Sequence, residues 1–330
     1  MKAMICRSFA AIENLRLETV DDPVATPGTA VIDVIASGIN FPDGLIVQGK
    51  YQTQPPLPFS PGSEVAGVVR KVGEGVAGLS AGERVLAFCG TGGYAEAVAV
   101  PATQIWRLPE TVDCVQAAGF IVSYGTAWHA LRDRARLRRG ETLLVLGAAG
   151  GVGLAAVELG KVLGARVIAA ASSPKRVALA REHGADEVID YTAEGLRRRV
   201  KELTGGRGVD VAYDPIGGTL AEEAVRSLAW QGRYVIIGFA AGEIHKIPAN
   251  QLLLKSADAL GVIWGASLRS DPARHAAHVA ELLDLYARAA LRPHIPETHP
   301  LAGAVDALRR VMDRKVMGKV VLISGREANS

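Results

Sequence analysis

The chain has 330 residues, with 37 Lys and Arg against 34 Asp and Glu and a formal net charge of +3. This charge is too small, and the basic runs too short, to favour a nucleic-acid surface. Three widely separated cysteines give no disulfide framework and exclude a four-cysteine zinc site. The N-terminus becomes charged too early for a signal peptide, and no apolar run is long enough to span a bilayer. We therefore expect a cytoplasmic protein with no membrane or nucleic-acid partner.

The first third of the chain has the pattern of a small β domain. Short segments rich in β-branched residues are separated by clusters of Gly and Pro, which predicts a compact barrel or sandwich. The predicted strands include residues 30–36, 64–70 and 84–88.

The middle third alternates continuous apolar strands with helices, a pattern typical of a parallel sheet that is covered on both faces. The strands are predicted at residues 142–147, 166–171, 187–190, 209–213 and 233–238, and the helices at 152–163, 174–183, near 193–203 and 220–229. A helix at residues 272–290 and a closing strand at 319–323 follow. The fold class is therefore α/β.

A glycine-rich loop follows the first of these strands and opens a helix, in the order Ala148-Ala-Gly-Gly-Val-Gly153. Gly150 and Gly151 would let a pyrophosphate approach backbone N–H groups at the positive end of the helix. Gly153 would let the helix pack closely on the strand, and Ala149 and Val152 complete the expected contact. A plain tight turn is the alternative, but the strand–helix series that follows favours a dinucleotide.

The end of the second strand indicates which dinucleotide binds. An NAD site usually has Asp or Glu there, whereas this chain has Ser172, Ser173, Lys175 and Arg176. Hydroxyl donors and cations suit a 2′-phosphate, so we predict NADPH. The alternative is that the cations only solvate a helix start, where the helix dipole disfavours them. Gly238, Phe239 and Ala240 end the last strand, where a nicotinamide would lie.

Several motifs occur in one order along nearly the whole chain: Gly38-Ile-Asn-Phe-Pro-Asp43, Gln48-Gly-Lys-Tyr51, Pro61-Gly-Ser-Glu-Val-Ala-Gly67, Tyr124-Gly-Thr-Ala127, Asp214-Pro-Ile-Gly-Gly218 and Gly318-Lys-Val-Val321. In these motifs the chain resembles the medium-chain dehydrogenase/reductase superfamily. The resemblance implies a GroES-like β-barrel catalytic domain over residues 1–120, completed by about 265–330. It also implies a Rossmann NADPH-binding domain over residues 121–264.

The zinc dehydrogenases of this superfamily hold their catalytic metal with Cys, His and Cys, and the matching positions here are Asn40, Ser63 and Ala118. These residues are a poor zinc ligand set, so we expect no metal. In lacking these zinc ligands, the chain resembles the zinc-free quinone oxidoreductase (zeta-crystallin-like) branch of the superfamily. That resemblance implies a pocket lined by Asn40, Asp43 and Tyr51.

The resemblance also implies hydride transfer from NADPH to a quinone or an α,β-unsaturated carbonyl. Tyr51 is then the expected hydrogen-bond donor to the developing oxyanion, with Asn40 orienting nicotinamide or substrate and Asp43 supporting the loop. Alternatively, Tyr51 caps a loop edge and Asp43 is a structural hydrogen-bonder. Thr126, Tyr191 and Lys319 are implied as further cofactor contacts.

Two other functions fit the same sequence pattern. One is an enoyl-thioester reductase, which shares the fold and the hydride step. The other is a nucleotide-binding or structural protein without turnover.

The apolar segment at residues 257–263 could form the edge of a sheet. Together with the family resemblance, this segment favours a homodimer.

Overall fold

The computed structural model describes residues 1–325, which form two compact units. Unit 1 comprises Met1–Val122, Ser267–Arg288 and residues 293–325, and unit 2 comprises Ser123–Ala266 and Ala289–Arg292. Within residues 1–325, no helix combines the length and the apolar character needed to cross a membrane.

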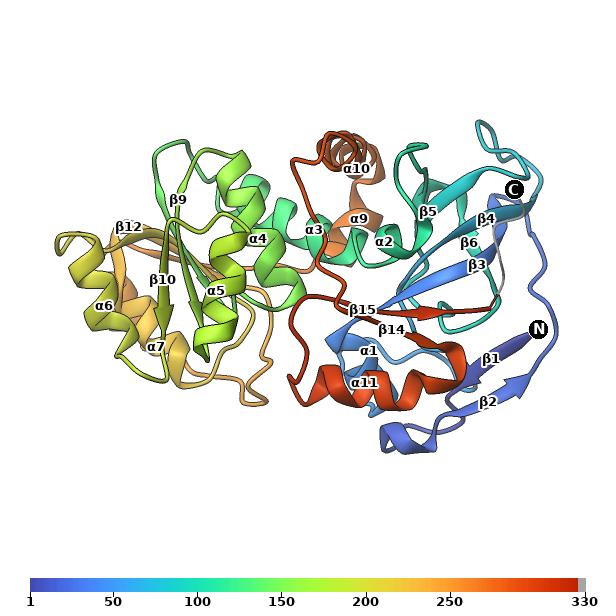
Figure 1. Cartoon of the computed structure of the whole chain (residues 1–330), viewed down its shortest axis with the longest axis horizontal. Coiled ribbons are helices and arrows are strands. Elements are labelled where there is room, and N and C mark those ends of the chain that lie inside the picture. Colours follow the sequence, from blue (N-terminus) through green and yellow to red (C-terminus); the bar gives the residue numbers. More distant parts are fainter. Residues whose placement is uncertain (326–330) are drawn as a thin grey trace. The chain divides into compact units, whose positions relative to one another are not determined.

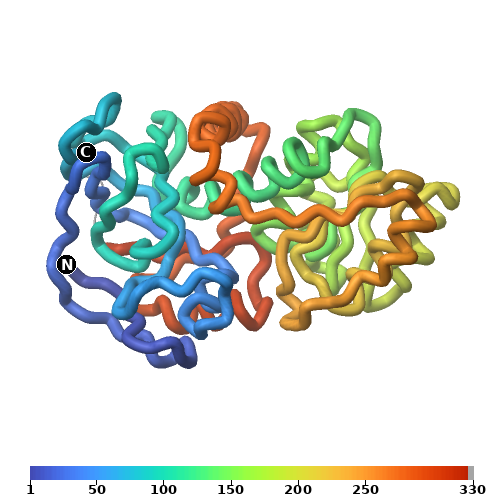
Figure 2. The backbone as a smooth tube through the Cα atoms, turned by 180° about the vertical axis from the view of Figure 1, so that it is seen from behind, coloured from blue at the N-terminus to red at the C-terminus, as the bar shows by residue number. Residues whose placement is uncertain are grey.

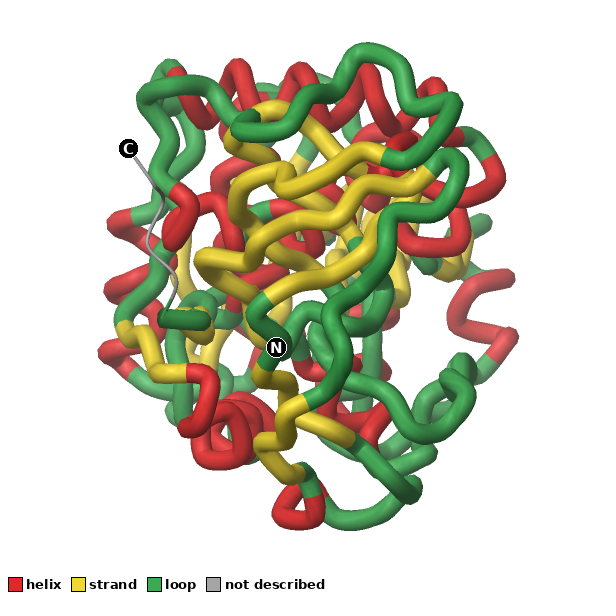
Figure 3. The backbone as a smooth tube through the Cα atoms, turned by 90° about the vertical axis from the view of Figure 1, so that its right-hand side faces the viewer, coloured by secondary structure: helices red, strands yellow, loops and turns green. Residues whose placement is uncertain are grey.

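Unit 1 is built around a seven-stranded sheet, seen with its strands toward the viewer in Figure 3. The strand order is β14-β15-β3-β4-β5-β7, and β6 pairs with β3. A separate antiparallel pair precedes it, β1 (Lys2–Ile5) and β2 (Arg16–Thr19). The bounds in the large sheet are Thr29–Ile39 (β3), Glu64–Val72 (β4), Arg84–Phe88 (β5), Ala97–Pro101 (β6), Ile105–Arg107 (β7), Glu297–Pro300 (β14) and Val320–Ile323 (β15).

The end of the chain returns to its beginning in unit 1. Helix α11 (Ala304–Met312) packs against α1 (Phe41–Val47), and one apolar core contains Met4, Ile46 and Leu308 (Figure 2). The other helices of this unit are α2 (Cys114–Ala118), most of α9 (Trp264–Ser270) and α10 (Pro272–Ala287), with 3-10 turns η1 (Ile12–Asn14), η2 (Ala102–Gln104) and η4 (Leu301–Gly303). Helix α10 ends three residues before the predicted boundary, just before Ala289 takes a left-handed conformation at φ +55°.

Unit 2 has a six-stranded, wholly parallel sheet in the order β10-β9-β8-β11-β12-β13. In chain order this is 3-2-1-4-5-6, the doubly wound arrangement, so the predicted α/β fold is confirmed. The direction of winding reverses between β8 and β11, where such sheets bind ligands at their carboxyl ends. The strands are Thr142–Leu146 (β8), Arg166–Ala171 (β9), Glu187–Asp190 (β10), Val209–Asp214 (β11), Leu228–Ile236 (β12) and Asp258–Gly261 (β13).

Helices cover both faces of this sheet, as Figure 1 shows. Helix α4 (Gly151–Val162) and α5 (Pro174–Glu182) lie on one face, with α6 (Leu196–Leu203) and α7 (Thr219–Arg226) on the other. Successive strand residues alternate between the faces, so Leu143 contacts α4 while Leu144 packs with α6 and α7. The remaining elements are α3 (Ile121–Trp128), a π-helix (His129–Arg134) and α8 (Ala249–Leu253).

In unit 2, the predicted boundaries differ most from the structure around β12, which also ends at Ile236, two residues before the predicted end at Gly238. The predicted helix 220–229 ends at Arg226, and β12 begins at Leu228, five residues before the predicted strand start. The register between β11 and β12 shifts here, and Gln231 takes a left-handed φ of +57°. An irregular strand start interrupts the two-residue period, so the pattern resembled the end of a helix.

Candidate functional site

A buried polar cluster in unit 1 joins residues that are far apart in sequence. Lys319, just before β15, donates from Nζ to the Asn40 Oδ1 atom and the Glu64 Oε1 atom at 2.7 Å each, and to the Ile39 carbonyl at 2.9 Å. Glu64 is fully buried and Lys319 is 7% exposed. An ammonium group has three donors, and all three of these are used.

Asn40 and Glu64 complete the cluster. The Asn40 Nδ2 atom donates to Glu64 Oε1 at 2.9 Å and lies 3.3 Å from the Ser63 hydroxyl. The other oxygen of Glu64 accepts the backbone N–H of Val122 at 2.9 Å. A side chain at Gly38 would overlap the Ala118 carbonyl and the Glu64 carboxylate, which explains the glycine in this motif. The cluster therefore fixes the amide of Asn40 in one orientation.

This cluster does not fit a zinc ion. Asn40 and Ser63 supply an amide and a hydroxyl, and Ala118 has no ligand atom in its side chain. The group that neutralises Glu64 is the Lys319 ammonium, at 2.7 Å. Across residues 1–325, no three His, Cys, Asp or Glu side chains are grouped so that they could hold a metal.

Asp43 lies beside this cluster on α1 and is 1% exposed. Its Oδ2 atom accepts the backbone N–H of Asn40 at 2.8 Å and the Tyr94 hydroxyl at 2.9 Å. Its Oδ1 atom accepts no hydrogen bond from the described part of the chain. Burial raises the pKa of Asp43 to about 6, although the bonds from Asn40 and Tyr94 act in the opposite direction. Asp43 therefore holds the start of α1.

We predict that Asp43 makes folding stability fall as the pH rises. The folded carboxyl binds its proton more tightly than the unfolded one, so its contribution decreases between about pH 4 and pH 6 and stays constant above. The shift corresponds to roughly 3 kcal/mol. Asp43→Asn, which keeps an acceptor oxygen, should remove this slope. Urea unfolding of both proteins across the window checks it, and parallel pH profiles would contradict the prediction.

Tyr51 follows α1 and is partly buried against the same apolar core as Met4 and Leu308. Burial first, and then the nearby Asp43 carboxylate, raise the pKa of the Tyr51 phenol, while Gln52 and Arg269 act in the opposite direction. A phenol with a raised pKa keeps its proton at neutral pH, as a hydrogen-bond donor must.

Tyr94 belongs to this site but was not predicted from the sequence. It is fully buried, and its hydroxyl donates to Asp43. The signal that could have found it is a lone aromatic residue directly after Gly92 and Gly93.

In unit 2, the predicted glycine loop lies at the carboxyl end of β8. Gly150 is the N-cap of α4, and no side chain within residues 1–325 caps it, so the N–H groups of the first turn remain available to an anion. A Cβ atom at Gly153 would overlap the carbonyl oxygen of Gly147, so the close approach of α4 to the strand requires glycine. Ala149 is buried, and Gly151 and Val152 are half-buried in the first turn of the helix. The local geometry fits a pyrophosphate.

The residues that were predicted to contact a 2′-phosphate lie directly after the end of β9. Ser173 is the N-cap of α5 and accepts the backbone N–H of Arg176 at 3.4 Å, with Ser172 and Lys175 exposed on either side. Tyr191 follows β10, and its N–H donates to the Ala171 carbonyl at 3.1 Å, which places it at the same sheet edge. A carboxylate on the neighbouring strand, Asp190, accepts from the hydroxyl and N–H of Thr192 at 2.6 and 3.0 Å.

The other predicted cofactor residues of unit 2 lie on α3 and after β12. Thr126 is half-buried on α3, which is held to α4 by a 2.8 Å bond from the Tyr124 hydroxyl to the buried Glu158. Gly238, Phe239 and Ala240 follow β12, and the N–H of Ala240 donates to the Pro215 carbonyl at 3.1 Å. The segment of Gly238, Phe239 and Ala240 therefore lies at the carboxyl ends of β11 and β12.

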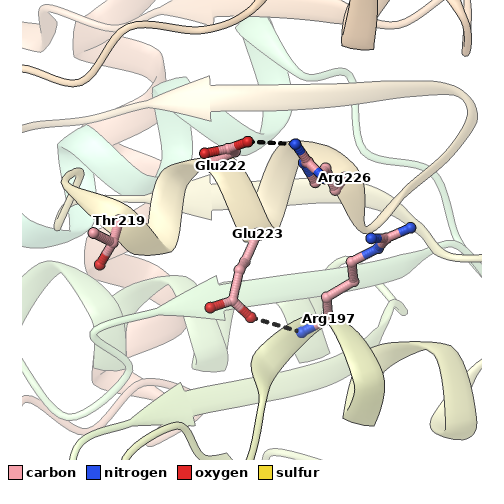
Figure 4. A pocket seen from close by; sticks show the side chains of 5 residues that line it. All are labelled: Arg197, Thr219, Glu222, Glu223 and Arg226. Carbon is pink, nitrogen blue, oxygen red and sulfur yellow. Dashed lines mark hydrogen bonds and ion pairs between the residues drawn. The ribbon is translucent and has the colours of Figure 1, made fainter.

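A separate groove of about 350 Å³ lies along α6 and α7 (Figure 4). Glu222 accepts from Arg226 at 2.6 Å, and Glu223 accepts from the backbone N–H of Arg197 at 3.1 Å. Both carboxylates of the groove thus accept hydrogen bonds from its own residues, and none of the predicted site residues line it.

Comparison with known proteins identifies both units. Residues 26–110 match the alcohol dehydrogenase GroES-like domain family, and residues 151–283 match the family described as zinc-binding dehydrogenase. A quinone oxidoreductase-like protein 2 homolog of Nematostella vectensis is 42% identical over 92% of this chain and 85% of its own length. The rat quinone oxidoreductase is 32% identical over 98% of both chains.

Solved structures of related proteins have the same fold as this chain. The quinone oxidoreductase of Escherichia coli, in complex with NADPH, superposes with a TM-score of 0.91 at 29% identity, over 98% of this chain and 100% of its own. The predicted GroES-like and Rossmann architecture is thereby confirmed. The chain belongs to the medium-chain dehydrogenase/reductase superfamily, in its quinone oxidoreductase-like branch.

Proposed function

We propose that this protein is an NADPH-dependent reductase that transfers hydride to a quinone or an α,β-unsaturated carbonyl without zinc. The observation that carries the proposal is the carboxyl edge of the unit 2 sheet. There an uncapped, glycine-lined helix start at Gly150 lies beside the hydroxyl and cationic groups of Ser173 and Lys175. Bound NADPH would supply the hydride. The NADPH complex of the related E. coli enzyme supports the same choice of cofactor.

Independence from zinc is supported by the charge of the unit 1 cluster. The Lys319 ammonium already neutralises Glu64, and Lys319 is buried. A divalent cation placed beside this ammonium would be repelled at short range, more strongly because the surroundings are buried. Without a metal, the developing oxyanion needs a hydrogen-bond donor, and we assign that role to Tyr51.

The other site residues receive supporting roles in this proposal. Asn40 orients the nicotinamide or the substrate, and Asp43 holds the loop that carries Asn40. Lys319 acts indirectly, because its three donors are used within the protein. The proposed cofactor contacts are Thr126, Ala149, Gly150, Gly151, Val152, Gly153, Ser172, Ser173, Lys175, Arg176, Tyr191, Gly238, Phe239 and Ala240.

The cofactor assignment is tested by titration with both dinucleotides. Wild type should bind NADPH more tightly than NADH, and Lys175→Ala should weaken NADPH roughly ten- to a hundredfold, because a charge-assisted contact to phosphate is lost. NADH affinity should not change. Lys201→Ala, which removes an exposed cation from α6 on the other sheet face, is the control. Equal affinity of wild type for the two dinucleotides would overturn the assignment.

We infer that two copies pair through β13. This strand is one of the two edges of the unit 2 sheet, and the neighbouring segments expose Leu253 (79%) and Ile263 (56%). An unpaired edge with exposed apolar side chains suits a twofold partner. Sedimentation equilibrium should give twice the chain mass of 34.6 kDa. A single-chain mass at micromolar concentration would exclude the dimer.

A further inference from the structure

Three polar side chains in unit 2 form a chain of hydrogen bonds that the proposed reaction does not use. Asp214 is the last residue of β11, Tyr234 lies in β12, and His245 lies in the segment that follows β12. The Tyr234 hydroxyl is 2.5 Å from the Asp214 Oδ2 atom and 3.0 Å from the His245 Nε2 atom. Asp214 and Tyr234 are buried, and His245 is half-buried.

The hydrogen-bond directions follow from Asp214. Its Oδ1 atom accepts the backbone N–H groups of Ile216 and Gly217 at 2.7 and 2.9 Å, so this carboxylate acts as an acceptor throughout. Burial, with the adjacent carboxylate, raises the pKa of the Tyr234 phenol, which therefore keeps its proton and donates a hydrogen bond to Asp214. The phenol oxygen must then accept from Nε2–H of His245. In the neutral imidazole this leaves Nδ1 as an acceptor, buried and without a partner among the described residues.

His245 connects this chain to the predicted nicotinamide edge. Its ring centroid is 5.7 Å from that of Phe239. A Cβ atom at Gly217 would lie 3.2 Å from both the His245 Nδ1 atom and the Phe239 ring, so the imidazole is packed between a turn and Phe239. The N–H groups of Ala240 and Ala241 bond to the carbonyls of residues 215 and 216. Beyond them, most of residues 241–250 are exposed. The imidazole, together with Ile247, which packs against the apolar core, thus holds a mostly exposed segment against the sheet end.

We propose that His245, held by Tyr234 and Asp214, is a positioning residue for the nicotinamide end of the cofactor. It fixes the Phe239 ring and with it the backbone of residues 238–240. This role rests on the proposed NADPH function, but no proton is transferred along the hydrogen bonds between Asp214, Tyr234 and His245. Its effect is geometric: a loosened segment leaves the glycine loop of α4 intact, so the dinucleotide still binds while the reacting end is less well aligned.

The variants separate donation from packing. His245→Leu removes the donor, whereas His245→Gln carries an amide N–H that can reach the Tyr234 oxygen. His245→Leu should lower kcat roughly ten- to a hundredfold, while the dissociation constant for NADPH stays within about a factor of two. His245→Gln should retain most of the wild-type kcat. Lys246→Ala, at the exposed neighbouring position, is the control for changes in the segment itself.

A measurement on the wild-type protein covers the case in which His245→Leu fails to fold. Nitrogen-15 NMR of the imidazole should show a protonated Nε2 and an unprotonated Nδ1, and NADPH should shift the Phe239 and His245 signals. A protonated Nδ1 with a bare Nε2 would overturn the proposal. A wild-type kcat in His245→Leu would also overturn it. The same holds if His245→Gln lowers kcat as much as His245→Leu does. If wild type binds neither dinucleotide, the proposed function fails and not this inference alone.

Discussion

Tyr51→Phe is expected to lower turnover with a simple enone by roughly a hundred- to a thousandfold. A hydrogen-bond donor at a developing oxyanion contributes about 2.7–4 kcal/mol, and this substitution removes the hydroxyl while keeping the ring. The raised pKa of Tyr51 keeps the phenol protonated, which the role requires. The dissociation constant for NADPH should change little. The loss should be smaller with quinones, since their product oxygens are better stabilised.

The matched control is Tyr286→Phe, which removes a hydroxyl from another partly buried tyrosine of unit 1 whose ring stacks on Phe120 at 4.9 Å. That variant should retain turnover with both kinds of substrate. Steady-state rates for the two variants, with one quinone and one enone, make the comparison. Wild-type turnover of Tyr51→Phe with both substrates would show that the donor is water or a cofactor hydroxyl, and that Tyr51 only lines the pocket.

The second large effect concerns the Lys319–Glu64 pair. Lys319→Met should destabilise the fold by about 3–5 kcal/mol, because it leaves the Glu64 carboxylate buried without its counter-charge. Glu64→Gln alone should also destabilise strongly, since the ammonium is then unpaired. The double variant should recover much of the loss, because neither charge remains. Urea unfolding of the four proteins measures the coupling between the two residues.

An exposed ion pair of the same unit provides the contrast. Arg309→Met breaks the contact of Arg309 with Glu13, 2.6 Å apart at the surface, and should have a far smaller effect. If Lys319→Met proved no more destabilising than Arg309→Met, or if the loss of stability in the double variant equalled the sum of the losses in the single ones, Lys319 and Glu64 would not be a coupled charge pair.

Local patterns predicted most of the unit 2 architecture. The strands Arg166–Ala171 and Glu187–Asp190 were predicted to the residue, because continuous apolar runs bounded by turn residues mark buried parallel strands. Gly153 was predicted to allow close packing, and the Gly147 carbonyl shows why. The start of β12 was missed because its irregular register, with left-handed Gln231, has no clear period in sequence.

The polar networks depend on contacts that no local pattern contains. Lys319 and Asn40 are 279 residues apart, and Glu64 and Lys319 are 255 apart, so only the folded sheet brings them together. The sequence suggested that Asn40 and Lys319 matter, but not that they bind one another. Tyr94, Tyr234 and His245 were missed for the same reason.

We propose that the protein oxidises NADPH with a quinone or an enone and needs no zinc. The most direct test measures NADPH oxidation by chelator-treated protein, together with its metal content. We expect no stoichiometric zinc and undiminished NADPH consumption in the presence of acceptor, with NADH a poorer donor. Activity that disappears on chelation and returns with zinc, or a protein that binds NADPH but reduces no acceptor in a quinone and enone panel, would contradict it.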